Sequence, residues 1–366
     1  MMPAPAFRLR AVSGFGVKGP ACFLLEAAGA RLMLDLGEGP DAGRRPDLAG
    51  IGRVDAIVIS HGHADHAGAL DLAAGLGTPP VFATAPVRAL AADPRLAGAR
   101  DLPLAGQVRL AGLAVETGPC GHAPGAVWMR IGGAGGLLYT GDMGAESSLY
   151  RWLPPPPARA LVFDASYGAA DEPLAGQLAA LAAMAAARPL LLPAPPAGRG
   201  LEMALAFAAA GLPVALCPAH RQVAGRLLDH PGALVPGGAG ALAGLLAGSA
   251  ALRADSPAEG VMIAARPNGD AGLAAGLIAR FVRTREAGIV FTGHLATGKP
   301  AAALVASGAA SFRRWNVHPR RRDIAALAAS VRPGLAMAAF VAPQGAADLA
   351  AALPSLPLVL APEMRW

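Results

Sequence analysis

The sequence predicts an α/β protein made of two parts that differ in their arrangement of strands and helices. Residues 7 to 168 have the pattern of short strands joined by glycine turns, whereas helices and strands alternate regularly from about residue 170. Such alternation is typical of a parallel α/β domain. A third observation is a cluster of histidines directly after a buried strand, within VDAIVISHGHADHAGAL. The length of 366 residues fits two domains, or one domain that carries a large insertion.

The first part is predicted to begin with the strand FRLRAV, a glycine-containing loop, and a hairpin whose second strand, RLMLDLG, ends near Asp35. Apolar runs bounded by glycine and proline indicate the other strands, and Ala/Leu-rich runs indicate the helices. In chain order these are a strand at 56–59, a helix near 67–75, a strand at 80–84, a helix at 86–92, and strands at 107–110, 113–117, 137–140 and 161–163.

The second part alternates helices and strands. Helices are predicted at 174–187, 200–210, 223–228 and 271–283, and strands at 190–192, 214–216, 261–264 and 289–292, with a further strand and helix before residue 253. After residue 311, a strand at 312–318, a helix at 321–330, a strand at 335–341 and a helix at 346–353 are predicted to complete the chain.

The composition limits the class of protein. The longest weakly apolar run, 238–252, is too short to span a bilayer, and the N-terminus MMPAPAFRLR lacks the apolar core of a secretory signal. The three cysteines are scattered, so no disulfide framework is expected. These features predict a cytoplasmic protein without membrane association. The formal net charge of +6 suits a polyanionic partner without identifying one.

The histidine-rich loop is the strongest chemical signal in the chain. His61 and His63 are two residues apart, so on an extended loop their side chains point the same way. Asp65 and His66 follow at the expected start of a helix, from where they can face the same point. Imidazole is a preferred zinc ligand, and a carboxylate adds charge compensation and a ligand oxygen. A metal site therefore explains the loop better than a set of structural histidines.

Two further candidate ligands lie at strand ends next to glycine. His122 precedes the strand AVWMRI, and Asp142 follows the strand LLYT. Side chains at such positions project from the rim of a sheet, although either residue alone would more often be structural. Asp35 ends an earlier strand, where it is expected either to hydrogen-bond a ligand histidine or to terminate the strand.

The motif HxHxDH, followed by His122 and Asp142, resembles the signature of the metallo-β-lactamase fold. The resemblance implies an αββα sandwich with two Zn²⁺ ions and a metal-bridging hydroxide that acts as the nucleophile. It also implies a division of the ligands, with His61, His63 and His122 on one zinc, Asp65 and His66 on the other, and Asp142 between them.

Further segments resemble the β-CASP nucleases, in which a parallel α/β domain interrupts the metallo-β-lactamase fold. They are the opening run GFGVKGPACFLLEAAGARLMLDLGEG, FDASYG, LLLPAPPAGRGLEMAL with Arg199 and Glu202, GIVFTGHLATGKPAAAL and WNVHP. The resemblance implies a first metallo-β-lactamase part at 1–168, a short β-CASP-like domain at 169–305, and a last metallo-β-lactamase part at 306–366.

The chain also departs from the β-CASP pattern. The family usually has a further histidine on the final strand, in a Val-His-Gly context. Here that strand reads Ala339-Phe340-Val341-Ala342, so Ala342 or a neighbour stands in its place. That histidine ordinarily completes the second zinc site. Arg320 stands where an aspartate usually follows the returning histidine.

The resemblance implies a zinc-dependent hydrolase that cleaves RNA or DNA, with single-stranded RNA as the favoured partner. Exonuclease action and a homodimer are both compatible with the resemblance. His318, oriented by Asp164, would contact the scissile phosphate or protonate the leaving oxygen, and Asp65 would also serve catalysis. The residues expected to bind the substrate backbone are Arg199, Lys299, Arg313, Arg314 and Arg320. Two alternatives stay open: a small-molecule metallo-hydrolase on the same scaffold, and a non-catalytic nucleic-acid-binding paralogue.

Overall fold

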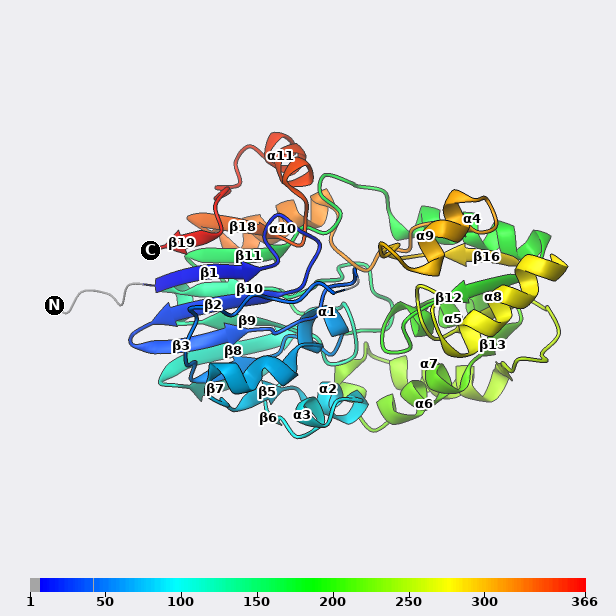
Figure 1. Cartoon of the computed structure of the whole chain (residues 1–366), viewed down its shortest axis with the longest axis horizontal. Coiled ribbons are helices and arrows are strands. Elements are labelled where there is room, and N and C mark those ends of the chain that lie inside the picture. Colours follow the sequence, from blue (N-terminus) through cyan, green and yellow to red (C-terminus); the bar gives the residue numbers. More distant parts are fainter. Residues whose placement is uncertain (1–6, 42) are drawn as a thin grey trace. The chain divides into compact units, whose positions relative to one another are not determined.

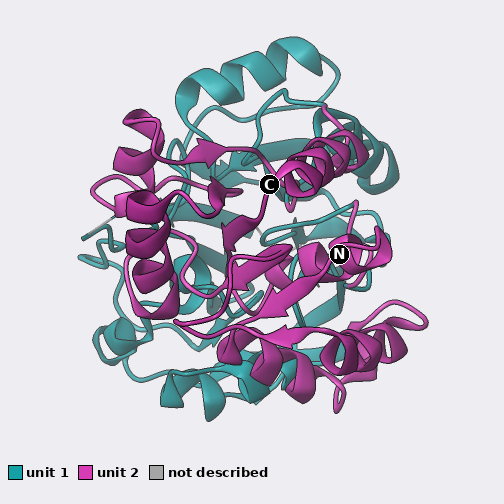
Figure 2. Cartoon of the chain, turned by 90° about the vertical axis from the view of Figure 1, so that its right-hand side faces the viewer, with its two compact units in different colours: residues 1–145, 150–171, 318–366 teal, residues 146–149, 172–317 magenta. Residues whose placement is uncertain are grey.

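A computed structural model describes residues 7–41 and 43–366, which form two compact units (Figure 2). Unit 1 contains residues up to 145, 150–171 and 318–366, and unit 2 contains 146–149 and 172–317. Apart from residues 146–149, unit 2 runs from Glu172 to Val317, and it includes the short strand after residue 310 because that strand pairs with the sheet of unit 2.

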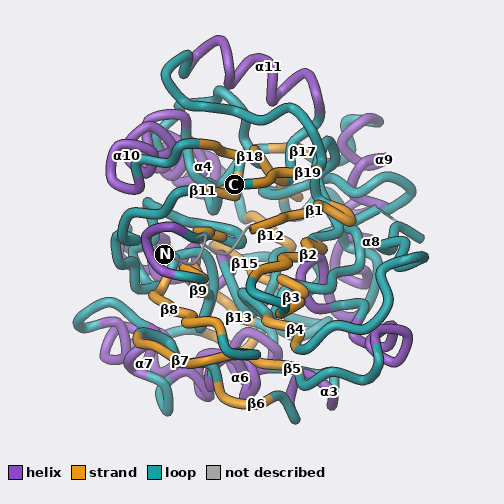
Figure 3. Tube along the Cα trace, turned by 90° about the vertical axis from the view of Figure 1, so that its left-hand side faces the viewer, coloured by secondary structure: helices purple, strands orange, loops and turns teal. Residues whose placement is uncertain are grey.

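Unit 1 contains two mixed sheets. In the first, seven strands lie in the order β19-β1-β2-β3-β4-β5-β6, which can be followed in Figure 3. Strands β1, β2 and β3 are antiparallel neighbours, whereas β3 to β6 are parallel. The strands are β1 (Phe7–Ser13), β2 (Cys22–Ala27), β3 (Ala30–Leu34), β4 (Ala56–Val58), β5 (Val81–Ala83), β6 (Arg100–Asp101) and β19 (Glu363–Arg365).

The second sheet has six strands in the order β18-β11-β10-β9-β8-β7. Strands β18, β11 and β10 are parallel, and β10 to β7 are antiparallel neighbours. The strands are β7 (Gly106–Leu110), β8 (Leu113–Pro119), β9 (Val127–Ile131), β10 (Leu137–Tyr139), β11 (Ala160–Asp164) and β18 (Leu335–Ala339).

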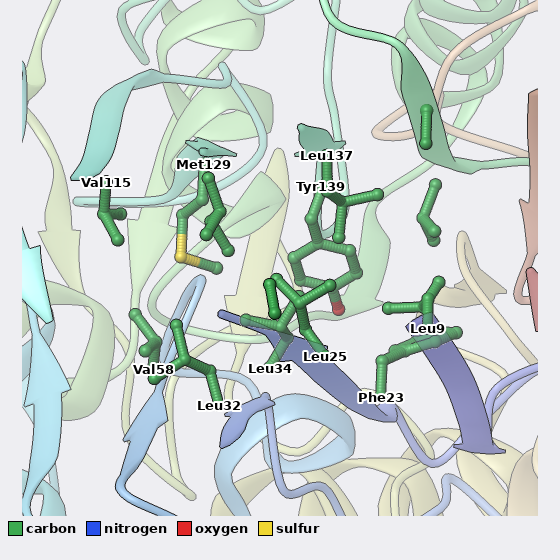
Figure 4. Packing of buried hydrophobic residues seen from close by; sticks show 14 of the residues in the cluster. Leu9, Phe23, Leu25, Leu32, Leu34, Val58, Val115, Met129, Leu137 and Tyr139 are labelled. Carbon is green, nitrogen blue, oxygen red and sulfur yellow. The ribbon is translucent and has the colours of Figure 1, made fainter. Parts of the chain in front are cut away.

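The alternation of side chains along the strands builds the core between the two sheets. On β2, Phe23 and Leu25 face this core, while Leu24 faces the outer layer. Leu137 and Tyr139 on β10 meet them from the second sheet, as Figure 4 shows. Burial of these apolar side chains contributes about 1.5–3 kcal/mol each, so this core is the main source of stability for the unit.

Helices cover the outer faces of both sheets (Figure 1). The first sheet packs its outer side chains against α1 (Ala64–Ala67), η1 (Leu70–Leu76), α2 (Ala85–Leu90) and α3 (Pro94–Ala97), and the second against α10 (Arg321–Val331) and α11 (Pro343–Ala352). A short turn, η2 (Gly133–Gly135), connects β9 and β10. The predicted αββα sandwich is confirmed.

Unit 2 is a parallel α/β unit, which confirms the predicted fold class of the insertion. Its strand order is β14-β13-β15-β12-β16-β17, and every neighbouring pair is parallel. The strands are β12 (Leu190–Pro193), β13 (Val214–Leu216), β14 (Ala250–Ala251), β15 (Val261–Ala264), β16 (Gly288–Phe291) and β17 (Ser311–Phe312). The helices are α4 (Leu174–Ala187), α5 (Arg199–Ala209), α6 (Pro218–Leu227), η3 (Pro231–Ala233), α7 (Gly238–Gly248), α8 (Gly272–Thr284) and α9 (Pro300–Ala306).

Several elements differ from the sequence prediction, among them α3, β6 and α9, which were not predicted. The strand predicted at 312–318 is wrong beyond Phe312, because Asn316 leaves the ladder and hydrogen-bonds Gln177 and Glu146. The helix expected near 67–75 is divided at Gly68 into α1 and η1. Strand β19 was not predicted; it pairs with β1 at the edge of the first sheet. Among the described residues, every helix is too short or too polar to cross a membrane.

One buried carboxyl group makes the stability of unit 2 depend on pH. Burial raises the pKa of Glu202, on α5, to about 7, although Ser147 Oγ donates a hydrogen bond to Glu202 Oε1 at 2.6 Å. Because the folded-state pKa lies above the unfolded value, this group stabilises the fold fully below about pH 4.3 and loses that contribution as the pH rises through 7.

We therefore expect Glu202→Gln to be stabilised relative to wild type at high pH. From pH 5 to pH 8, the difference in free energy of unfolding should change by about 2 kcal/mol in favour of the variant. Thermal or urea unfolding across this range measures it. Glu259→Gln, which removes a charge at an exposed position of the same unit, should show no comparable trend. A pH-independent difference for Glu202→Gln would contradict the assignment.

Candidate metal centre

The two sheets of unit 1 bring a set of polar residues to one place because parallel strands present their carboxyl ends at the same edge. Asp35 directly follows β3, His61 lies three residues after β4, and Asp142 lies three residues after β10. Asp164 is the last residue of β11. The strands fix the backbone of each residue, and short loops then carry the functional side chains.

Three histidines form the first group of candidate metal ligands. His61, His63 and His122 each offer a ring nitrogen within 4.8 Å of the others. Nε2 of His122 lies 3.1 Å from Nδ1 of His63, and the ring centroids of His61 and His122 are 4.8 Å apart. Three imidazole nitrogens that face a common point are the ligand set of many zinc sites.

The burial and the unpartnered ring nitrogen of His61 fit the binding of a metal ion. Its side chain is fully buried, and its Nε2 has no hydrogen-bond partner among residues 7–41 and 43–366. Burial, reinforced by the neighbouring His66, holds the pKa of His61 well below its usual value, so the ring is neutral at pH 7. A buried polar atom without a partner is costly, and a neutral imidazole nitrogen is a good ligand for a divalent cation. The residues present therefore fit the metal that the motif implies.

Asp142 connects the histidines of this site. Its Oδ1 lies 3.2 Å from Nε2 of His66, and its Oδ2 lies 3.5 Å from Nε2 of His122 and 3.7 Å from Nδ1 of His318. Burial disfavours the charged carboxylate, but the surrounding histidines outweigh burial and hold the pKa of Asp142 well below its usual value. Two further ligand groups include this carboxylate, one with His61 and His66 and one with His122 and His318.

Asp35 orients His66 from behind. Its Oδ2 lies 2.7 Å from Nδ1 of His66 and accepts hydrogen bonds from Ser60 Oγ at 2.7 Å and Tyr139 OH at 2.5 Å. Its Oδ1 accepts a bond from the Ser60 backbone N–H at 2.6 Å. Four donors thus converge on one fully buried carboxylate. The contact between Asp35 and Nδ1 of His66 leaves Nε2 of His66 directed at Asp142, as expected for a ligand histidine whose other nitrogen is held by a carboxylate.

The two carboxylates also control the charge of His66. Burial lowers its pKa, but Asp142 and Asp35 together outweigh burial and raise the pKa of His66 well above its usual value. The metal-free site therefore favours a protonated His66, and a bound cation would have to displace that proton.

A second carboxylate–histidine pair lies beside the first. Asp164 Oδ2 lies 2.7 Å from Nδ1 of His318, while the Asp164 carboxylate also accepts bonds from the backbone N–H groups of Met143 and Ser166. Burial disfavours the carboxylate charge, but His318 more than compensates and lowers the pKa of Asp164. Nζ of Lys18 lies 3.4 Å from Nε2 of His318 and donates to Ser166 Oγ at 2.7 Å.

Two glycines allow the loops to approach this closely. Gly141 has a left-handed φ of +55°, and a Cβ there would meet Ser60 Oγ at 2.6 Å. A Cβ on Gly37 would lie 1.8 Å from the carbonyl oxygen of Asp65. Both positions therefore require glycine so that the ligand loops can pack against one another.

Asp65 and His66 have different surroundings, although the sequence assigned both to a second zinc. His66 joins a group with His61 and Asp142, whereas Asp65, in the first turn of α1, belongs to none of the three ligand groups found among the described residues. Phe340, directly after β18, lies beside His66. Its ring centroid lies 5.1 Å from that of His66.

The residues expected to bind the substrate backbone have partners of their own. The buried Nε of Arg199 donates to Thr292 Oγ1 at 3.0 Å, and Nζ of Lys299 pairs with Asp270 at 2.8 Å. Arg313 is exposed and donates to the carbonyl of Phe312, and Arg314 is partly exposed. Arg320, in unit 1, forms a two-bond pair with Asp323 at the start of α10. Of the five, only Arg320 lies in the unit that contains the metal centre.

Lys18 and Tyr139 were not predicted by the sequence analysis. Lys18 is one of two lysines in a chain with 29 arginines. The rarity of lysine in this chain is the sequence feature that could have marked Lys18 as a candidate site residue. Tyr139 lies within an ordinary apolar strand, and nothing local distinguishes its hydroxyl. Tyr139 reaches the site from the core between the two sheets, and Lys18 reaches it from the loop between β1 and β2.

Comparisons with known proteins agree with this geometry. A family model described as the Metallo-beta-lactamase superfamily matches residues 15–194, which include the predicted ligands from His61 to Asp142. The match confirms the predicted superfamily.

Curated relatives match a shorter segment. Transcription termination factor FttA of Cenarchaeum symbiosum is 38% identical over 87 residues, and that of Methanothermobacter thermautotrophicus is 36% identical over 92 residues. These segments cover 21% and 23% of this chain and 14% of each relative, so the chain spans about one seventh of their length.

A solved structure shares the fold over nearly the whole chain. The crystal structure of a protein of unknown function from Enterococcus faecalis V583 has a TM-score of 0.59 at 14% identity, and the superposition covers 99% of this chain and all of that one. At this identity the likeness concerns the fold alone.

The buried position of Asp35 predicts the effect of its substitution on metal binding. Asp35→Asn keeps the shape of the side chain but removes the negative charge, so His66 is no longer oriented and polarised. We expect metal affinity to fall by about 10–100-fold, measured by competition with a chromophoric chelator.

Asp348→Asn, on the exposed face of α11, is the matched control and should bind metal as wild type does. Wild-type affinity in a folded Asp35→Asn variant would contradict this role of Asp35.

Proposed function

Because residues 15–194 form a domain of the metallo-β-lactamase superfamily, we propose that the chain is a zinc-dependent nuclease that hydrolyses phosphodiester bonds of single-stranded RNA. One observation carries the proposal: the histidine–aspartate cluster adjoins a second carboxylate–histidine pair that has a lysine beside it. A phosphodiester requires these three functions together, namely a metal, a proton donor and a cation for the phosphate charge.

Zinc suits the ligand set. His61, His63 and His122 provide three imidazoles, and Asp142 provides a charged oxygen. Nitrogen-rich sites of this kind favour zinc over magnesium or calcium, which prefer oxygen ligands. When bound, the metal lowers the pKa of water toward neutrality and stabilises negative charge on phosphate oxygens.

His318 is the proposed proton donor. Asp164 accepts from Nδ1 and fixes the orientation of the ring, so Nε2 is the nitrogen available to the substrate. The lowered pKa of Asp164 keeps this carboxylate charged, so it remains an acceptor for Nδ1 of His318. From Nε2 the proton passes to the oxygen of the departing nucleotide as the bond from phosphorus to that oxygen breaks.

Lys18 is proposed to bind a non-bridging phosphate oxygen. Its ammonium group donates to Ser166 Oγ at 2.7 Å, and Nε2 of His318 lies 3.4 Å from it. A phosphate oxygen can replace either contact and gain a charge-assisted hydrogen bond.

Nucleic acid is favoured over a small-molecule substrate by the relatives. Both reported relatives bear the name of a transcription termination factor, and their similarity to this chain supports a nucleic-acid substrate. The three buried free cysteines suit a reducing cytoplasm, where such a substrate is found. A small-molecule phosphodiesterase is the second candidate, supported by the run Ala339-Phe340-Val341-Ala342, which has no histidine where β-CASP nucleases have one.

The direct test uses 5′-labelled single-stranded RNA and DNA of one sequence, with the zinc-loaded protein and after chelation. We expect metal-dependent cleavage of RNA, loss of cleavage in Asp142→Ala, and unchanged cleavage in the exposed control Asp348→Ala. Intact oligonucleotides with turnover of bis(p-nitrophenyl) phosphate would support the small-molecule alternative. Undiminished cleavage by Asp142→Ala would contradict the mechanism.

Leaving-group dependence tests the role of His318. The departing nucleotide oxygen needs a proton, whereas p-nitrophenolate departs without one. His318→Gln should therefore lower kcat on RNA by about 10²–10⁴-fold and affect bis(p-nitrophenyl) phosphate much less. Asp164→Asn should also lower kcat on RNA more than on bis(p-nitrophenyl) phosphate, but by a smaller factor. Equal losses on both substrates would exclude proton donation by His318.

The salt dependence of binding tests Lys18. With metal removed by a chelator, Lys18→Met should weaken the binding of a single-stranded oligonucleotide and reduce the slope of log K against log salt by about 0.7, the value for one phosphate contact. Lys18→Arg should restore the slope. Fluorescence anisotropy at several salt concentrations measures it, and an unchanged slope in Lys18→Met would show that the lysine contacts no phosphate.

A further inference from the structure

We infer that this centre holds one tightly bound metal ion, at His61, His63 and His122, and that the aromatic ring of Phe340 closes the second metal position. The inference rests on the proposed metal dependence and specifies the metal content of the same site. The ring of Phe340 lies beside His66, on the side from which a further ligand of the second metal would have to approach.

The position of Phe340 follows from the sheet. Strand β18 runs parallel to β11, and Ala339 is the register partner of Asp164. The next residue, Phe340, therefore lies at the same carboxyl edge as Asp164 and Asp142. Its side chain is 2% exposed, and its ring meets that of His66 at 65° with 5.1 Å between centroids.

The surroundings of Phe340 keep its ring in this position. The residue adopts a left-handed φ of +63°, and its backbone N–H donates to the carbonyl of Gly14 at 2.8 Å. A Cβ on Gly14 would approach the Phe340 ring to 3.1 Å, and the Phe23 ring lies edge-on at 6.0 Å. A bulky residue in this backbone region is uncommon and persists only where the neighbouring packing holds it.

The second position has too few ligands for tight binding. His66 and Asp142 face each other there, but the phenyl ring offers no lone pair and excludes water from the side of His66 that it covers. Asp65 joins no ligand group among the described residues. Although His61 also lies within reach, it is assigned to the first position, so two protein ligands remain here. Two ligands hold zinc far less firmly than three imidazoles, since zinc sites have three or four protein ligands.

His318 is a poor substitute for the missing ligand. It forms a candidate group with His122 and Asp142, but its Nδ1 is engaged by Asp164 at 2.7 Å. The ammonium of Lys18 lies 3.4 Å from its other ring nitrogen. A second cation at His318 would therefore face the positive charge of Lys18.

Metal content measured without substrate tests the inference. The protein is loaded with excess zinc, passed through a column equilibrated with a weak chelator, and analysed for zinc per chain. We expect one equivalent for wild type and two for Phe340→His, which places an imidazole beside His66. Phe340→Leu changes the packing without adding a ligand, so it should retain one equivalent.

Electron paramagnetic resonance of the cobalt-loaded proteins gives an independent readout. A single isolated Co²⁺ signal is expected for wild type, and a spin-coupled pair for Phe340→His. Two tightly bound equivalents in wild type, no bound metal in wild type, or one equivalent in a folded Phe340→His variant would each overturn the inference. Because no substrate is used, absence of nuclease activity alone would contradict the proposed function and not this result.

Discussion

The site of unit 1 depends on the buried carboxylate of Asp35. One charged group joins the end of β3 to the loop after β4, to α1 and to β10, because it accepts hydrogen bonds from Ser60 and Tyr139 and holds His66. Removing a carboxylate from water costs several kcal/mol, and only a full set of partners offsets that cost. The partners come from separate elements, so the fold that satisfies Asp35 also brings the ligand loops together.

The same design occurs twice at this edge of the sheets. Asp35 orients His66 toward Asp142, and Asp164 orients His318 at the end of the neighbouring strand β11. In each pair, a carboxylate at a strand end fixes Nδ1 of a histidine and leaves Nε2 directed at the site. The first pair serves the metal position and the second serves the proposed proton transfer, so two functions arise from one structural arrangement.

Local patterns in the sequence predicted much of this arrangement. The histidine loop, His122 and Asp142 were identified from residue type and strand-end position, and the structure brings them together. The proximity of Lys18, Tyr139 and Phe340 could not be predicted, because each reaches the site through contacts between segments that are distant in the chain. Strand β19 and the shortened β17 also depend on tertiary contacts that override the local apolar pattern.

Anomalous diffraction from a crystal of the zinc-loaded protein, recorded on both sides of the zinc absorption edge, tests the central claim most directly. The account predicts one strong peak about 2.0–2.1 Å from ring nitrogens of His61, His63 and His122. A strong peak elsewhere, or none at these three histidines, would contradict it.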